Sequence, residues 1–198
     1  MVKIQDHFKS AKMGRKLNSE DQSQAPLLSI PTFETSHFIL RSLKAEDYDA
    51  LYLAASDPKI WEQHPANDRH TAKGFLNFWQ TIFAYPGSMA IIDRKSNEII
   101  GTSSFYDYSP EKKEVTIGYT FLSRAYWGGH FNFEIKKVMI EYAFSFADKV
   151  NFHVGSQNLR SRMALKKIGA VQIAEFEKKQ SVGPAMINVV YQIDKLRW

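Results

Sequence analysis

The chain has 198 residues, 44% of them hydrophobic, which allows one domain with a packed core and leaves too little for two. It has no cysteine, which excludes disulfides, thiolate metal sites and a cysteine nucleophile. No apolar run approaches the roughly 20 residues of a membrane span, and the net charge of +5 suits an anionic cofactor, an acidic substrate or nucleic acid without choosing among them. We expect a cytoplasmic protein with no membrane contact.

The first 32 residues form a segment of different character from the rest. They are rich in Ser, Gln, Lys and Asn, they show no sustained hydrophobic period, and their first sixteen positions hold five cations against the single acidic residue Asp6. We expect a flexible basic and polar arm over residues 1–32 and a folded domain over residues 33–198.

Hydrophobic periodicity predicts alternating helices and strands in the first part of the domain. In chain order we expect a strand, two helices and three strands: 37–43, 47–55, 71–85, 88–93, 99–108 and 114–122. The last three strands follow one another through short turns, which is typical of an antiparallel meander.

The second part continues with a long helix, a short strand, a basic helix and two strands: 131–147, 150–154, 158–168, 170–177 and 185–194. Gly169 is the expected cap of the basic helix. The whole order predicts a mixed sheet with helices on both faces. Within it, residues 114–154 form a strand-loop-helix-strand unit that brings a helix N-terminus to the end of a strand, where anions bind.

Two adjacent glycines, Gly128 and Gly129, stand just before the long helix. Glycines at this place allow a ligand to approach backbone N–H groups, and the helix dipole favours a diphosphate there. The same pair is also common in a tight turn. The residues alone therefore leave both interpretations open.

The surrounding stretch resembles motif A of the GNAT acetyltransferase superfamily, in particular the ribosomal-protein alanine acetyltransferases. The similarity is carried by Gly118-Tyr119-Thr120-Phe121-Leu122, followed by Tyr126-Trp127-Gly128-Gly129. Downstream, Asn158-Leu159-Arg160-Ser161 and then Lys167-Ile168-Gly169-Ala170 resemble motif B. The resemblance covers residues 33–194. It implies a mostly antiparallel mixed sheet of about seven strands flanked by about four helices.

The resemblance also implies a cofactor, acetyl-CoA, and the residues that bind it. The backbone of Phe121 and Leu122 would pair with the pantetheine arm, and Asn158 would bond the pantetheine region. The diphosphate would lie in the loop that follows, on Trp127, Gly128, Gly129, His130, Phe131 and Asn132. One departure concerns His130, which stands where the family has the first glycine of this loop.

The implied reaction is attack of an amine on the thioester, helped mainly by orientation and by stabilisation of the carbonyl oxygen. Ser161 matches a hydroxyl proposed in relatives to protonate the departing thiolate, although a hydroxyl in a first helical turn is also an ordinary local hydrogen-bonding group. Glu114 is the first candidate for the general base, because bases of this superfamily often lie on this strand. Tyr106, Tyr108 and Glu34 are further candidates.

Two other classes of function are weighed against the acetyltransferase. One is a non-catalytic CoA-binding sensor or scaffold, which the altered glycine loop would suit. The other is a nucleic-acid module, suggested by the cations of the 158–168 helix but unsupported by any recognised motif. No metal site is expected. The acceptor, a small-molecule amine or a protein N-terminus, is not specified by the sequence, and a homodimer is left open.

Overall fold

In the computed structural model, eight strands form one sheet in the order β1-β2-β3-β4-β5-β6-β8-β7. The structure describes residues 25–128, 130–178 and 186–198. The strands are β1 (Phe33–Glu34), β2 (Phe38–Ser42), β3 (Gly87–Asp93), β4 (Ile99–Ser109), β5 (Glu114–Leu122), β6 (Lys149–Gly155), β7 (Val171–Lys178) and β8 (Met186–Asp194). Neighbouring strands are antiparallel except β5 and β6, which are parallel.

Five α-helices accompany the sheet in the described part of the chain: α2 (Ala25–Leu28), α3 (Tyr48–Ala55), α4 (Ala72–Phe83), α5 (Phe131–Ala143) and α6 (Leu159–Lys167). Local capping sets several of their ends. Thr71 caps α4 by accepting from the Gly74 N–H at 3.1 Å. Gly169, at φ +86°, follows α6 in the left-handed conformation that commonly ends helices. Within these ranges, none of the helices has both the length and the apolar character needed to cross a membrane.

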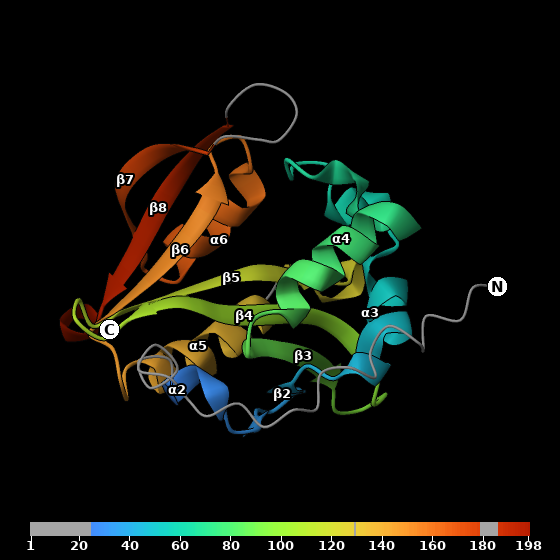
Figure 1. Ribbon diagram of the computed structural model, residues 1–198, viewed down its shortest axis with the longest axis horizontal. Coiled ribbons are helices and arrows are strands. Elements are labelled where there is room, and N and C mark those ends of the chain that lie inside the picture. The colour runs from blue at the N-terminus through green and yellow to red at the C-terminus, as the bar shows by residue number, and fades with distance from the viewer. Residues whose placement is uncertain (1–24, 129, 179–185) are drawn as a thin grey trace.

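The helices cover both faces of the sheet and bury two hydrophobic cores (Figure 1). On one face, α3 and α4 build an aromatic core around Trp61, Phe75 and Trp79. On the other, α2 and α5 pack on the sheet through residues such as Ile135 and Met139. Short α6 lies against β6 and adds Leu165 and Ile168 to this second core. The sheet is therefore held from both sides, and its central strand β5 contributes residues to both cores.

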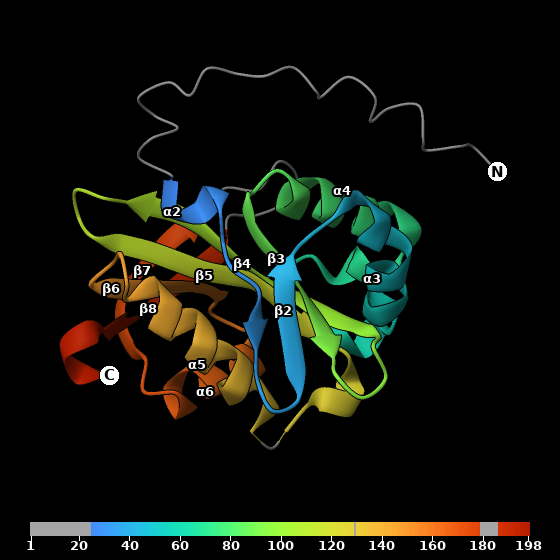
Figure 2. The ribbon, with the colours of Figure 1, turned by 90° about the horizontal axis from the view of Figure 1, so that it is seen from below.

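The parallel pair β5 and β6 is joined at one end only. Their register runs from Glu114 opposite Lys149 to Thr116 opposite Asn151 and stops there. Beyond that point β6, β8 and β7 fan away from β3, β4 and β5, which is visible in Figure 1 and, from a direction turned by 90°, in Figure 2. The sheet thus opens along the second half of β5.

The expected fold class is confirmed, with one more strand and one more helix than the sequence predicted. Strand β1 has two residues, too few to leave a periodic pattern. Helix α2 lies inside the segment expected to be a flexible arm, and there Leu27 and Ile30 are buried in the core. The long helix ends at Ala143, earlier than expected, although Phe144 and Ala147 continue its buried face. Residues 1–24 of the arm lie outside the described residues.

Candidate active site

Two cavities meet where β5 and β6 separate. The narrow cavity, of about 200 Å³, lies over the carboxyl end of β5 and the starts of α5 and α6. The wide cavity, of about 1210 Å³, extends along the gap between β5 and β6. Six residues line both of them: His64, Thr120, Asn132, Asn158, Ser161 and Ala164. The two cavities therefore adjoin one another along a shared set of residues.

A β-bulge shapes β5 where it passes this space. Thr102 of β4 pairs with Phe121 of β5, and Ser104 of β4 pairs with Gly118. Between these two pairs β5 therefore has one residue more than β4. Within the bulge Tyr119 adopts a φ of 50°, in the left-handed region that a tyrosine rarely enters. Bulges re-aim side chains and interrupt regular pairing, often beside active sites. Here the bulge places Tyr119, Thr120 and Phe121 along the cavity walls.

The loop between β5 and α5 closes the narrow cavity. The indole N–H of Trp127 donates to the Leu122 carbonyl at 2.9 Å, which folds the loop back onto the end of β5. Gly128 follows with a φ of +76° and open space on its Cβ side. Asn132, in the first turn of α5, lines both cavities. The N-terminal end of α5, with its unpaired backbone N–H groups, therefore points toward this space.

The start of α6 forms the opposite wall. Asn158 is buried and caps the helix, its side-chain oxygen accepting from the Ser161 N–H at 3.1 Å. Ser161 lies in the first turn and lines both cavities. Arg160 crosses the narrow cavity, with its guanidinium 4.0 Å from the centre of the Trp127 ring and a 2.8 Å bond to the Ile60 carbonyl. This cation–π contact links α6 to the loop of Trp127 across the cavity.

A buried lysine reaches the floor of the wide cavity from α5. Lys136 is 4% exposed, and its Nζ donates to Thr120 Oγ1 at 2.6 Å and to Ser103 Oγ at 3.1 Å. These partners are hydroxyls, so no carboxylate compensates the charge in these two bonds. Burial consequently lowers the pKa of Lys136 from 10.5 to about 7. The lysine can therefore be either neutral or charged near physiological pH.

Aromatic rings and a second cation also line the wide cavity. Arg69 lies over Phe78, 4.2 Å from its ring centre, and burial lowers its pKa to about 10. The rings of Tyr85, Tyr106 and Tyr119 contact one another at centroid distances of 5.0–5.5 Å. Burial raises the pKa of Tyr106 and of Tyr119, so both phenols keep their protons at neutral pH.

Most residues expected to bind a cofactor come together at the narrow cavity. It is lined by Phe121, Leu122, Trp127, Gly128, Asn132, Asn158 and Ser161. His130 and Phe131 line neither cavity. Phe131 instead packs on Phe38 at a centroid distance of 5.5 Å, and the exposed His130 faces Glu134. Gly129 lies outside the described residues.

The structure does not bring the first candidate base to the site. Glu114 stands at the closed end of β5, where its carboxylate accepts from Asn151 at 3.1 Å and pairs with Lys149 at 3.4 Å. The sequence predicts the strand that carries Glu114 but not which end of that strand opens, so this position could not be foreseen. Tyr108 donates to the Phe146 carbonyl and Glu34 pairs with Arg94, so neither belongs to the cavities. Tyr106 does line the wide cavity.

Sequence reasoning missed Lys136 and Arg69. The signal for Lys136 was present, because it falls at helical spacing with Asn132, Ile135 and Met139, on the buried face of α5. A lysine on an apolar helix face requires an explanation, and here the cavity provides it. Arg69 lies in a short irregular segment, η4 (Asn67–His70), where no periodicity exists to reveal burial.

Comparisons with known proteins agree with this geometry. A family model described as an acetyltransferase (GNAT) domain matches residues 37–171, more than half of the chain. An uncharacterised N-acetyltransferase, p20 of Bacillus licheniformis, is 29% identical over 58% of this chain and 66% of its own length. A second, YoaA of Bacillus subtilis, is 25% identical over 70% of this chain and 82% of its own length.

Solved structures share the fold at lower identity. A GCN5-related N-acetyltransferase from Brucella melitensis superposes with a TM-score of 0.75 at 18% identity, over 85% of this chain and 80% of that one. A spermidine N-acetyltransferase from Vibrio cholerae, in complex with CoA and spermine, has a TM-score of 0.63 at 12% identity, over 82% and 98% of the two chains. A ribosomal-protein-S5-alanine acetyltransferase from Vibrio fischeri has a TM-score of 0.59 at 18% identity, over 85% and 99%. The family match, together with the opened β5 and the loop at the start of α5, identifies the chain as a member of the GNAT acetyltransferase family.

Proposed function

We propose that the protein transfers an acetyl group from acetyl-CoA to a primary amine, by direct attack while both substrates are bound. The observation that carries the proposal is the joining of the two cavities through Thr120, Asn158 and Ser161. One cavity would hold the thioester and the other the amine. In the reaction a C–N bond forms, the C–S bond breaks, and the amine loses a proton while the thiolate gains one.

The narrow cavity fits the chemical groups of CoA. Because β5 pairs with β6 only as far as Thr116, its later backbone groups face the gap and can pair with an extended amide-bearing chain. The pantetheine arm is such a chain. The N-terminal end of α5 and the glycine backbone at Gly128 suit a diphosphate. When bound, acetyl-CoA supplies the activated acetyl thioester, and the protein supplies position and polar contacts.

Ser161 is the residue that we assign to the leaving group. It lies on the wall shared by both cavities, at the point where the thioester would meet the amine. Its backbone is fixed by the bond from its N–H to Asn158, so the hydroxyl is held in the first turn of α6. We assign it the role of donating a proton to the departing thiolate. Asn158 positions it and does not itself exchange protons.

The base that deprotonates the amine must come from the wide cavity. Glu114 stands at the other end of β5, where it bonds to Asn151, so we do not assign it this role. Four side chains of the kinds that act as general bases line the wide cavity: His64, Asp107, His153 and Glu177. Tyr106 is less suited, because its raised pKa keeps the phenol protonated. We propose that one of these four groups acts, directly or through water.

The acceptor is a small-molecule amine or a protein N-terminus. The wide cavity is large and lined by both aromatic rings and carboxylates, which suits a positively charged amine before it loses its proton. The Vibrio proteins of similar fold are named for spermidine and for a ribosomal protein alanine, so both classes should be tested. A non-catalytic CoA sensor is the alternative, in which acetyl-CoA binds and no amine is acetylated.

Calorimetric titration with acetyl-CoA, beside desulfo-CoA and ATP, is the first experiment. We expect micromolar binding of acetyl-CoA and negligible binding of ATP. Turnover on polyamines, amino acids and N-terminal peptides can then be followed by the release of CoA thiol, without background because the protein has no cysteine. Binding without turnover on any amine would favour the sensor. Absence of acetyl-CoA binding would overturn the proposal.

A glycine pair provides a matched control for the location of the site. Gly128 and Gly169 both have positive φ, of +76° and +86°, with open space where a Cβ would lie, so Gly128→Ala and Gly169→Ala should cost about 1 kcal/mol each in stability. Only Gly128 lines the narrow cavity. We therefore expect Gly128→Ala alone to weaken acetyl-CoA binding, by about tenfold. Equal affinities for the two variants would place the cofactor elsewhere.

A further inference from the structure

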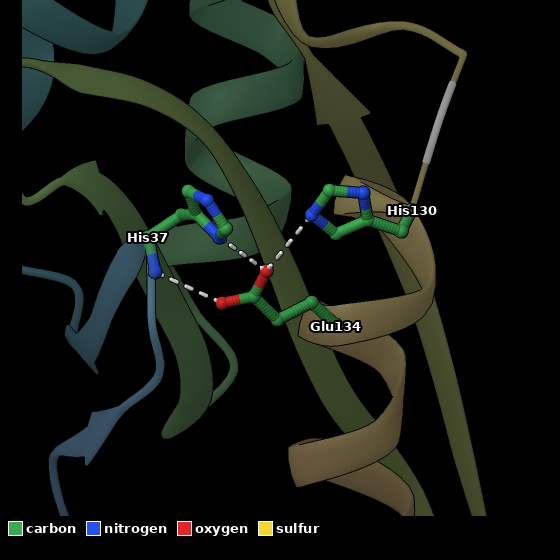
Figure 3. A group of neighbouring side chains, drawn as sticks. All are labelled: His37, His130 and Glu134. Carbon is green, nitrogen blue, oxygen red and sulfur yellow. Dashed lines mark hydrogen bonds and ion pairs between the residues drawn. The ribbon is translucent and has the colours of Figure 1, made fainter.

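A group of three side chains beside the active site plays no part in the proposed transfer. His37 directly precedes β2, His130 caps the start of α5, and Glu134 lies one turn into that helix (Figure 3). His37 Nδ1 lies 2.7 Å from Glu134 Oε2, and His130 Nε2 lies 3.9 Å from the same oxygen. None of the three lines either cavity. They form a separate cluster on the outer side of the α5 start.

We propose that His37, His130 and Glu134 bind one divalent transition-metal ion of the zinc type. Two imidazoles and one carboxylate are a donor set that zinc uses in proteins, with a water molecule as the fourth ligand. One ligand atom from each of the three residues lies within 4.8 Å of the others. In a tetrahedral site with bonds near 2.0–2.2 Å, the ligand atoms are about 3.3 Å apart. Small side-chain rotations therefore bring the three atoms to bonding distance.

The carboxylate is already oriented for a single metal bond. Glu134 Oε1 accepts the backbone N–H of His37 at 2.9 Å, which leaves Oε2 as the atom that both imidazoles approach. Hydrogen bonds of this kind orient metal-binding carboxylates in known sites. The His37 and His130 side chains are 47% and 65% exposed, so an ion and its water can enter from solvent. Access and orientation are thus both provided.

The site also accounts for the departure in the loop. His130 stands where the family resemblance places a glycine, and it is four residues before Glu134, the spacing that puts two side chains on one helix face. His37 directly precedes β2 and is 97 residues from Glu134 in the sequence, so a bound ion would link the start of β2 to the start of α5. The partial positive charge at the N-terminus of α5 repels a cation and should weaken its affinity by a factor of about two to five. The carboxylate of Glu134 offsets this, and we expect micromolar affinity.

The experiment is titration of untagged, chelator-treated protein with Zn²⁺ by calorimetry, and with Co²⁺ by visible absorption. We expect one Zn²⁺ per chain and a Co²⁺ spectrum with the intensity of a four-coordinate site. Affinity should fall as the pH is lowered, because metal binding requires deprotonated ligands. Absence of binding in either titration would overturn the proposal and leave the cluster as an ion pair between β2 and α5.

Variants locate the ion and separate this proposal from the proposed enzyme activity. His37→Ala, His130→Gly and Glu134→Gln should each weaken Zn²⁺ binding by at least about tenfold, while His70→Ala, a histidine outside the cluster, should change nothing. Circular dichroism checks that each variant is folded. His37 lies outside the loop assigned to the cofactor and lines neither cavity, so His37→Ala should lose Zn²⁺ and retain acetyl-CoA. Zn²⁺ binding that these three variants leave unchanged would place the ion elsewhere and refute the assignment.

Discussion

The two ends of β5 show how one strand can serve both the core and the active site. At its start, from Glu114 to Thr116, it pairs with β6 on one side and β4 on the other. At its end, from Gly118 to Leu122, β6 has moved away and a bulge interrupts the pairing with β4. At the closed end the backbone groups form hydrogen bonds to the two neighbouring strands. The open end has backbone groups that face the cavities.

The polar residues at the two ends of β5 have different roles: those at the closed end stabilise the sheet, and those at the open end lie beside the proposed active site. Glu114 at the closed end forms an ion pair with Lys149, partly exposed and screened by solvent. Thr120 at the open end contacts a buried lysine and a cavity that a ligand would fill. One end of β5 therefore carries an ion pair that contributes little to stability. The other end contacts a buried lysine whose pKa is lowered by burial. Each of the following changes tests one end.

Lys136→Met should give the largest effect, through the open end. Between pH 7 and 10.5 the folded protein binds fewer protons at Lys136 than the unfolded chain does, because burial lowers the pKa from 10.5 to about 7. The stability of the natural protein should therefore rise with pH across this window, and Lys136 should cost a few kcal/mol at pH 7. The methionine variant should lack this rise and be more stable at neutral pH, as measured by urea unfolding from pH 6 to pH 9.5.

The neighbouring Lys137 provides the control. It is 52% exposed and pairs with Glu141 at 3.7 Å, so Lys137→Met should change stability by less than about 0.5 kcal/mol at any of these pH values. Comparing each variant with the natural protein at the same pH removes the contribution of other titrating groups. If both variants followed the same pH curve as the natural protein, Lys136 would be charged and compensated in the folded state.

This lysine marks one limit of what the sequence could predict. Periodicity located α5 and the strands around it, because apolar residues at regular spacing determine which face is buried. The family motifs located Leu122, Trp127, Gly128 and Ser161, which all line the narrow cavity. Lys136, a single lysine within an apolar stripe, belongs to no motif and was not predicted as a site residue. Its burial depends on the gap between β5 and β6, which is a tertiary feature.

Ser161→Ala should have the next largest effect, on catalysis at the open end. Loss of a proton donor to the thiolate should lower kcat by roughly tenfold to a hundredfold, with the KM for acetyl-CoA nearly unchanged. The loss should shrink above about pH 8.5, where a free thiolate no longer needs the proton. Steady-state kinetics from pH 6.5 to pH 9.5 measure both quantities.

The matched variant is Ser161→Thr, which keeps the hydroxyl in the first turn of α6. It should retain most of the activity at every pH. An alanine variant with natural kcat would remove Ser161 from the mechanism, and a loss independent of pH would make it a residue that positions the substrate. Neither result would affect the assignment of the narrow cavity, which the glycine pair tests separately.

The wide cavity could be predicted from the sequence only in part, through the residues that it shares with the motifs and through Tyr106. Its lining comes from segments as distant as Arg69, Tyr106, Lys136 and Asn188, and no local pattern connects them. These residues come together beside the opening of the sheet between β5 and β6, which Figure 1 shows. The motifs identify the residues on β5, at the start of α5 and at the start of α6, and they do not identify the cavity residues that lie on other elements.

Glu114→Gln should give the smallest effect, because it changes the closed end alone. The glutamine oxygen can still accept from Asn151, now at 3.1 Å from the carboxylate, and only the ion pair with Lys149 is lost. Stability should fall by less than about 1 kcal/mol, and kcat/KM should stay within about twofold at every pH. Lys149→Met should lower the stability by the same small amount. The variant with both substitutions should be little less stable than either single variant, because both substitutions remove the same ion pair. If Glu114→Gln alone instead lowered kcat strongly without changing the affinity for acetyl-CoA, that result would assign Glu114 the role of the base. The amine would then have to bind at the end of β5 that pairs with β6.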